Sequence, residues 1–185
     1  VIIWGEPYDE CGIIQLLANA TRPFRADWPP AEYYYDGRPP NELSGDWIAN
    51  LFPALENFRN GHRALLDTMF AEPARRAGVA RWGIKEVRLG VEHGLYLRWL
   101  YPKARFVVLY RNPLDAYRSY SGYGRSWYDT FPDRPVFTPT AFGNHWRRLM
   151  EGFLQDAKRL DALTVRYEDL VGTSPPIDEI DAHLG

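Results

Sequence analysis

Short apolar runs alternate with longer amphipathic segments along the whole chain. Runs with the length of a single strand cover residues 1–4, 82–85, 105–110 and 162–166. Helical spacing predicts helices near 9–19, between 48 and 78, and at 91–100, 113–122, 139–160 and 176–184. Strands that alternate with helices in this way predict an α/β fold with a parallel sheet flanked by helices.

The richest segment joins the third predicted strand to the helix behind it. Phe106 to Tyr110 is an uninterrupted apolar and aromatic run, as expected for a strand covered on both faces. Asn112 and Pro113 suit the N-cap and first residue of a helix. Arg111 therefore stands at the carboxyl end of a strand, beside free N–H groups and the positive end of a helix dipole. This arrangement predicts an anion site.

Composition narrows the class of protein. The chain has 185 residues, is 45% hydrophobic and 25% charged, and is expected to form one globular domain. Its net charge of −2 disfavours nucleic acid as a partner. The single cysteine, Cys11, excludes an internal disulfide framework and a cysteine-based zinc cluster. No apolar run approaches the roughly 18 residues of a membrane span and no signal peptide is visible, so we expect a cytoplasmic location.

The segment after the third strand resembles a known family. The pattern Arg-Asn-Pro-x-Asp-x-x-x-Ser at 111–119, preceded by Pro-Lys-Ala-Arg and a hydrophobic strand, is similar to the segment by which sulfotransferases bind the 3′-phosphate of 3′-phosphoadenosine 5′-phosphosulfate (PAPS). The resemblance implies that Arg111 pairs bidentately with this phosphate and that Ser119 donates a hydroxyl hydrogen bond. Without the flanking matches, an ordinary exposed Arg is the simpler interpretation.

Three further segments resemble the family, and the first two of them resemble its tyrosylprotein and bacterial branch. They are Gly-Glu at 5–6, Trp-Gly-Ile-Lys at 82–85 and Tyr-Glu-Asp-Leu at 167–170. The resemblance implies that Glu6 is the base that deprotonates the acceptor, that Lys85 stabilises charge on the sulfonate and leaving oxygen, and that Tyr167 lies near the adenine. The alternatives are a water-exposed carboxylate for Glu6 and a surface pair with Glu86 for Lys85.

Other polar and aromatic positions have plainer interpretations. Glu168 suits a cap of the next turn or a partner for basic residues, and Trp146 suits packing. The basic residues of helix 139–160 suit a solvated face. The aromatic, proline-rich insert at 22–47 has two interpretations. It lines an acceptor cleft or acts as a lid, or it packs as a satellite core, and the same two interpretations hold for the loop 123–137.

Two departures from the family pattern refine the expectation. The stretch Glu86 to Gly90, directly after the Lys85 strand, contains no His, which separates the chain from the cytosolic branch that acts on phenols and steroids. No Gly-rich phosphosulfate loop is visible, so we expect a P-loop NTPase-like sulfotransferase domain over 1–185 that is truncated at its N-terminus, and at its C-terminus as a further possibility.

The sequence thus predicts an enzyme that transfers a sulfonate group from PAPS to a hydroxyl or amine acceptor, releases PAP (adenosine 3′,5′-bisphosphate), and needs no metal. Small-molecule, carbohydrate and peptide acceptors all remain open, as does the oligomeric state. The alternatives are a P-loop nucleotide kinase and a non-catalytic nucleotide-binding module. A kinase would need a phosphate loop and an Mg²⁺-holding Asp, neither of which is visible.

Overall fold

The computed structural model describes residues 1–6, 12–35, 37–43, 51–87, 89–122, 136 and 138–185. They fall into two compact units. The first unit contains Val1–Gly5 and Ile14–Lys85, and the second contains Glu6–Ile13 and Glu86–Gly185. Both units are α/β, with strands that pair in parallel.

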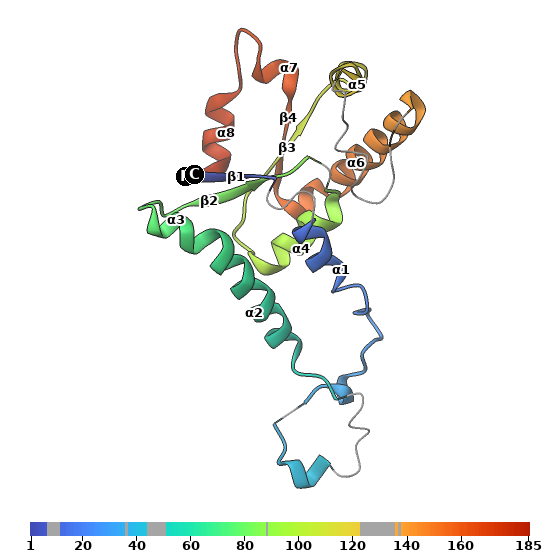
Figure 1. The fold of residues 1–185 in the computed structure, drawn as a ribbon, viewed down its shortest axis with the longest axis vertical. Coiled ribbons are helices and arrows are strands. Elements are labelled where there is room, and N and C mark those ends of the chain that lie inside the picture. The colour runs from blue at the N-terminus through green and yellow to red at the C-terminus, as the bar shows by residue number, and fades with distance from the viewer. Residues whose placement is uncertain (7–11, 36, 44–50, 88, 123–135, 137) are drawn as a thin grey trace. The chain divides into compact units, whose positions relative to one another are not determined.

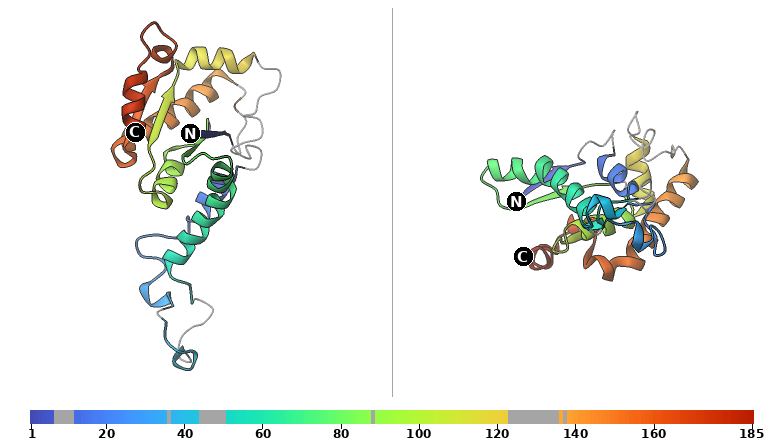
Figure 2. Two further views of the ribbon diagram at one scale, coloured as in Figure 1. Left: turned by 90° about the vertical axis from the view of Figure 1, so that its left-hand side faces the viewer. Right: turned by 90° about the horizontal axis from the view of Figure 1, so that it is seen from below.

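In the first unit, β1 (Ile2–Gly5) pairs with β2 (Trp82–Lys85), and the register joins Gly5 to Lys85. The helices of this unit are α1 (Ile13–Asn19), α2 (Leu55–Leu66), the π-helical turn η5 (Asp67–Ala71) and α3 (Glu72–Arg76). Figure 2 shows α2, η5 and α3 as one continuous helical segment.

The core of the first unit follows the spacing of apolar residues on this long helical segment. Leu66, Phe70 and Ala74 recur every four residues and are all buried, so they form one stripe on the helical surface. The Phe70 ring stacks on Trp82 of β2 with 5.8 Å between ring centroids. This stripe therefore packs the helical segment against the strand that ends at Lys85.

The insert between α1 and α2 contains two short 3-10 helices, η2 (Ala31–Tyr33) and η3 (Pro40–Leu43). Its aromatic rings contact one another. Trp28 meets Tyr33 edge to face at 5.5 Å, and Phe24 meets Phe58 of α2 at 5.1 Å. These contacts join the aromatic residues of the insert to one another and to α2.

In the second unit, β3 (Phe106–Tyr110) pairs with β4 (Ala162–Arg166), and the register joins Tyr110 to Arg166. The helices are α4 (Val91–Leu100), α5 (Pro113–Ser121), α6 (Pro139–Leu160), α7 (Tyr167–Leu170) and α8 (Ile177–Leu184). Figure 1 shows α5 and α7 at the same end of the strand pair, which is its carboxyl end.

Two glycines let α4 and α6 approach closely. A Cβ on Gly94 of α4 would lie 3.1 Å from a methyl of Leu160, and a Cβ on Gly152 of α6 would lie 3.1 Å from a methyl of Val91. Leu160 is fully buried. Because glycine has no Cβ, Gly94 and Gly152 allow this close distance between the two helices.

The strand β3 is covered on one face only. Val108 is buried, whereas Val107 and Leu109 are 39% and 52% exposed. The expectation of cover on both faces is therefore wrong for this strand. Alternate residues of a strand point to opposite faces, and the helices that pack in the second unit cover the face of Val108.

The helix ends agree with the sequence. The Asn112 side chain accepts a hydrogen bond from the Leu114 N–H at 2.9 Å, with Pro113 as the first helical residue of α5. Thr138 caps α6 through the Ala141 N–H at 3.1 Å. Side-chain oxygens thus satisfy amides that a helix start leaves open.

Strand pairing, the end of the last strand and the loop 123–137 bear on further expectations from the sequence. Within the units, the described strands pair two by two, β1 with β2 and β3 with β4. The last strand ends at Arg166, as predicted, and Tyr167–Leu170 form a short helix directly after it. The loop 123–137 is expected to line a cleft or to pack as a satellite core, and its aromatic residues lie outside the described residues. No helix within the described ranges is long and apolar enough to cross a membrane.

Candidate anion site at the carboxyl end of β3 and β4

Arg111 and Tyr167 meet at the carboxyl end of the second strand pair. Each is the first residue after its strand, and the register places Tyr110 opposite Arg166. The Arg111 guanidinium carbon lies 4.8 Å from the centroid of the Tyr167 ring. This distance is within the range of a cation–π contact, so the ring helps to hold the guanidinium in place. The structure thus brings together two of the predicted site residues.

The backbone after Arg111 is held by side chains from distant parts of the chain. The Trp146 indole N–H donates to the Arg111 carbonyl at 3.1 Å, and the Asn112 N–H donates to Glu168 Oε1 at 2.9 Å. Trp146 also packs against a small apolar cluster around Phe142. The packing predicted for it is confirmed, but the prediction did not include this hydrogen bond. A buried indole N–H needs an acceptor, but the sequence does not reveal which carbonyl supplies it.

Glu168 is an ionised acceptor at this site. Its second oxygen accepts from the Arg166 Nε–H at 3.1 Å. The hydrogen bond from the Asn112 N–H is the main cause that lowers the pKa of Glu168, and the Glu168 N–H and Arg166 act in the same direction. Glu168 therefore holds a basic partner, as expected. The amide that it binds lies at the start of α5 and not in the turn that follows β4.

The described part of the chain leaves the guanidinium of Arg111 open to an anion. Among the residues that the structure describes, no carboxylate lies within ion-pairing distance of it. Glu168 is engaged with Asn112 and Arg166. A half-buried guanidinium beside the N-terminus of the nine-residue helix α5 is suited to bind a phosphate or sulfate group.

Ser119 is exposed on α5, six residues after Pro113. At about 1.5 Å of rise per residue, it stands roughly 9 Å along the helix. Within the described part of the chain, no hydrogen bond joins it to Arg111. Its predicted contribution to the same anion site stays a prediction.

Glu6 and Lys85 belong to the end of the first strand pair. Lys85 is exposed and pairs in register with Gly5, the residue immediately before Glu6. Glu6 is half-buried and has φ of 33°. A non-glycine residue rarely adopts a positive φ, and such residues cluster at functional sites. The parallel register thus brings the carboxyl ends of β1 and β2 together, and the proposed roles of Glu6 and Lys85 stay predictions.

The histidines described here have structural surroundings. His93 is buried, and its Nδ1 accepts from the Gly90 N–H at 3.1 Å at the start of α4. Burial lowers the pKa of His62 on α2 and of His145 on α6, and nearby Arg148 lowers the pKa of His145 further.

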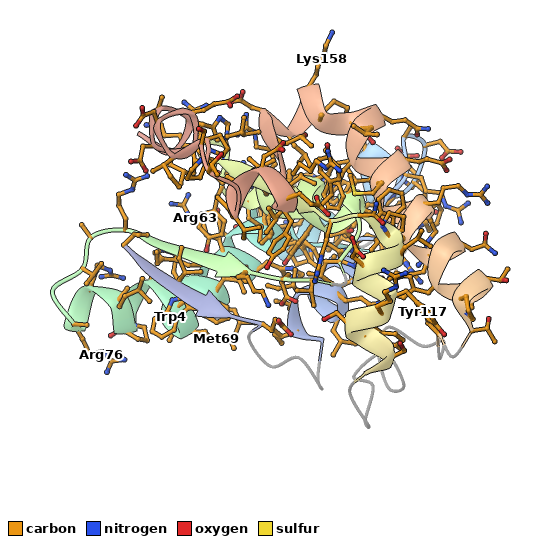
Figure 3. All side chains as sticks on the ribbon, turned by 90° about the horizontal axis from the view of Figure 1, so that it is seen from above. Trp4, Arg63, Met69, Arg76, Tyr117 and Lys158 are labelled. Carbon is orange, nitrogen blue, oxygen red and sulfur yellow. The ribbon has the colours of Figure 1, made fainter. Side chains whose placement is uncertain are left out.

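The basic residues of α6 form a solvated face. Arg147, Arg148, Lys158 and Arg159 are all exposed. Arg159 pairs with Asp156 one turn earlier at 2.8 Å, and Figure 3 shows Lys158 extending away from the ribbon. These residues are an ordinary charged helix surface, as predicted.

Two other features bear on ligands. No group of three or more His, Cys, Asp or Glu side chains with metal-binding geometry occurs among the described residues. A hollow of about 480 Å³ in the insert is lined by Pro23, Arg25, Asp27 and Trp28.

Comparison with curated proteins and with solved structures gave no match. A sequence model described as "Sulfotransferase family" matches residues 12–177, which include β2, β3, β4 and the whole anion site. The strand, capped helix and open guanidinium described above lie inside this match. The chain therefore belongs to the sulfotransferase family.

Proposed function

We propose that this protein transfers a sulfonate group from PAPS to a hydroxyl or amine acceptor, on a P-loop NTPase-like fold. The single observation that carries the proposal is the position of Arg111. It follows a parallel strand, precedes a capped helix, and lies on an aromatic ring with no described carboxylate beside it. Membership of the family supports the same reaction class.

The residues at the carboxyl end of β3 and β4 fit the 3′-phosphate of PAPS. Arg111 offers a rigid fork of donors that matches two phosphate oxygens. The start of α5 adds the positive end of a helix dipole. We assign Tyr167 to the same nucleotide through its aromatic face and Ser119 to a further hydrogen bond, which would require the ligand to reach along α5.

PAPS supplies the sulfonate, and the chain's own residues handle protons and charge. Glu6 takes the proton from the acceptor hydroxyl, which makes its oxygen a stronger nucleophile. The ammonium of Lys85 stabilises negative charge that develops on the leaving oxygen. The register that pairs Lys85 with Gly5 and the positive φ of Glu6 support these assignments. Small-molecule, carbohydrate and peptide acceptors all suit this chemistry.

A thermal-shift titration with PAP and with 5′-AMP tests the donor site. PAP should stabilise the wild-type protein by about 2.7 kcal/mol at a concentration of 100 times its Kd, and 5′-AMP at the same concentration should stabilise it less. Arg111→Ala should remove the preference for PAP.

Arg118→Ala is the matched control, because Arg118 lies on α5, is exposed, and pairs with Asp115 at 3.3 Å. It should leave the PAP preference unchanged. Equal stabilisation by PAP and 5′-AMP in the wild-type protein would contradict the proposed function.

A further inference from the structure

One peptide group at the anion site has both of its polar atoms bound by side chains. It is the group between Arg111 and Asn112. Its carbonyl accepts from the Trp146 indole at 3.1 Å, and its N–H donates to Glu168 at 2.9 Å. Trp146 and Glu168 are 35 and 56 residues away along the chain, so neither contact belongs to regular secondary structure. We call this arrangement the Arg111 clamp.

The Arg111 clamp restricts the backbone from which the guanidinium extends. A peptide group is planar, so two hydrogen bonds on its opposite edges fix the orientation of the whole plane. That orientation sets ψ of Arg111 and φ of Asn112. The root of the Arg111 side chain is thus held by the clamp, and its tip lies on the Tyr167 ring at 4.8 Å.

Both clamping side chains are themselves held. Trp146 packs against the buried cluster of Val136 and Phe142. The Glu168 carboxylate also accepts from Arg166, which ends β4 and pairs with Tyr110 directly before Arg111. The Glu168 carboxylate is ionised at neutral pH, which makes it the stronger acceptor, and its hydrogen bonds lower its pKa further.

We propose that Trp146 and Glu168 are positioning residues that preorganise Arg111 for the 3′-phosphate of the nucleotide. This inference rests on the proposed function, because it assigns a ligand to Arg111. Holding a flexible, charged side chain in its binding geometry before the ligand arrives lowers the cost of binding. Loss of either contact should therefore weaken the recognition of the 3′-phosphate specifically.

The test compares affinities for PAP and 5′-AMP, because only PAP carries the 3′-phosphate. Trp146→Phe keeps the aromatic ring and removes the indole N–H, and Glu168→Ala removes the acceptor. Each change should raise the Kd for PAP by about three- to tenfold, the effect expected from the loss of one supporting hydrogen bond. The Kd for 5′-AMP should change by less than about twofold, so the ratio of the two affinities should fall.

Three further variants control for a purely structural effect. Trp99→Phe on α4 and Asp169→Ala, the exposed neighbour of Glu168 on α7, should leave the ratio unchanged. Glu168→Gln retains one oxygen that can accept from the Asn112 N–H, so it should restore part of the PAP preference. If Glu168→Ala does not fold, Trp146→Phe and Glu168→Gln carry the comparison. Loss of fold stability alone lowers the melting temperature but does not lower the affinity ratio of the folded protein.

The outcomes distinguish the positioning role of Trp146 and Glu168 from the proposed function. If the wild-type protein prefers PAP, Arg111→Ala abolishes the preference, and the clamp variants retain the full affinity ratio, the positioning role is wrong and the proposed function stands. If the wild-type protein shows no preference for PAP, both are overturned. A lower ratio in Trp146→Phe and Glu168→Ala, with normal control variants, supports the inference.

Discussion

At the scale of single residues, the site depends on which groups remain available to a ligand. Arg111 has an aromatic ring beneath it and no described carboxylate beside it, while Glu168, close by in the fold, is bound to an amide and to Arg166. An ion pair between Arg111 and Glu168 would have neutralised the site. The hydrogen bonds of Glu168 thus separate a structural carboxylate from a guanidinium that can bind an anion.

Glu6→Gln and Lys85→Ala test the proposed chemistry at the first strand pair. Removal of a general base typically lowers kcat by about 10²- to 10⁴-fold, and removal of a charge-stabilising donor by about 10²- to 10³-fold. The measurement is the initial rate of PAP release from PAPS across a panel of hydroxyl and amine acceptors. Lys158→Ala, a change of the same chemistry at an exposed lysine of the solvated face of α6, should have no effect. Unchanged turnover in Glu6→Gln and Lys85→Ala would contradict both roles.

At the scale of elements, close helix packing supports the strand pair that carries Arg111. The helices α4 and α6 approach through Gly94 and Gly152, and fully buried Leu160 lies against Gly94. Trp146 extends from the same helix α6 to the Arg111 carbonyl. The position of α6 against α4 therefore bears on the backbone of the anion site.

Gly94→Ala should destabilise the protein by about 1 kcal/mol. Ala gains about 1 kcal/mol over Gly in helix propensity, but its Cβ would overpack Leu160 at 3.1 Å, and overpacking typically costs about 1 to 3 kcal/mol. Gly61→Ala on the exposed surface of α2 is the matched control. Its Cβ meets nothing within 4 Å, so it should stabilise the protein by about 0.5 to 1 kcal/mol. Urea unfolding measures both, and equal effects of the two changes would refute the packing argument.

At the scale of the whole molecule, four side chains with shifted pKa values make stability depend on pH. Burial lowers the pKa of His62 and of His145 below 6.5, and hydrogen bonds to its carboxylate lower the pKa of Glu168 below 4.5. Burial raises the pKa of Tyr96. The folded state therefore favours neutral histidines, an ionised Glu168 and a neutral Tyr96.

Stability should accordingly be greatest near neutral pH and fall on both sides. The histidine contribution is complete above pH 6.5 and is lost as the pH falls from there through the lower folded-state pKa values, because the unfolded chain binds more protons. The Glu168 contribution is lost below pH 4.5, and the Tyr96 contribution above pH 10.

Urea unfolding at pH 7.5, 6.0 and 5.0 measures the histidine window. A double variant, His62→Asn with His145→Asn, should show a smaller loss of stability between pH 7.5 and 5.0 than the wild-type protein. An equal or greater loss in the variant would place the origin of the pH dependence elsewhere.

The sequence by itself determined most of the local structure and the family. Apolar runs and cap residues predicted the bounds of β2, α4 and α6 and the start of α5, because these features depend on neighbours along the chain. The same local pattern placed Arg111 between a strand and a capped helix. The predicted family was confirmed, since its motifs are short and continuous in sequence.

The tertiary structure alone decided which distant groups meet. The partners of the peptide after Arg111 come from residues 35 and 56 positions away, and the exposure of Val107 and Leu109 depends on which face of β3 the helices cover. The sequence shows that a residue is apolar or that an indole N–H needs an acceptor. It does not show which carbonyl accepts from the indole or which face of a strand the helices cover. Strand register and helix packing make that choice, and they arise only when the whole chain has folded.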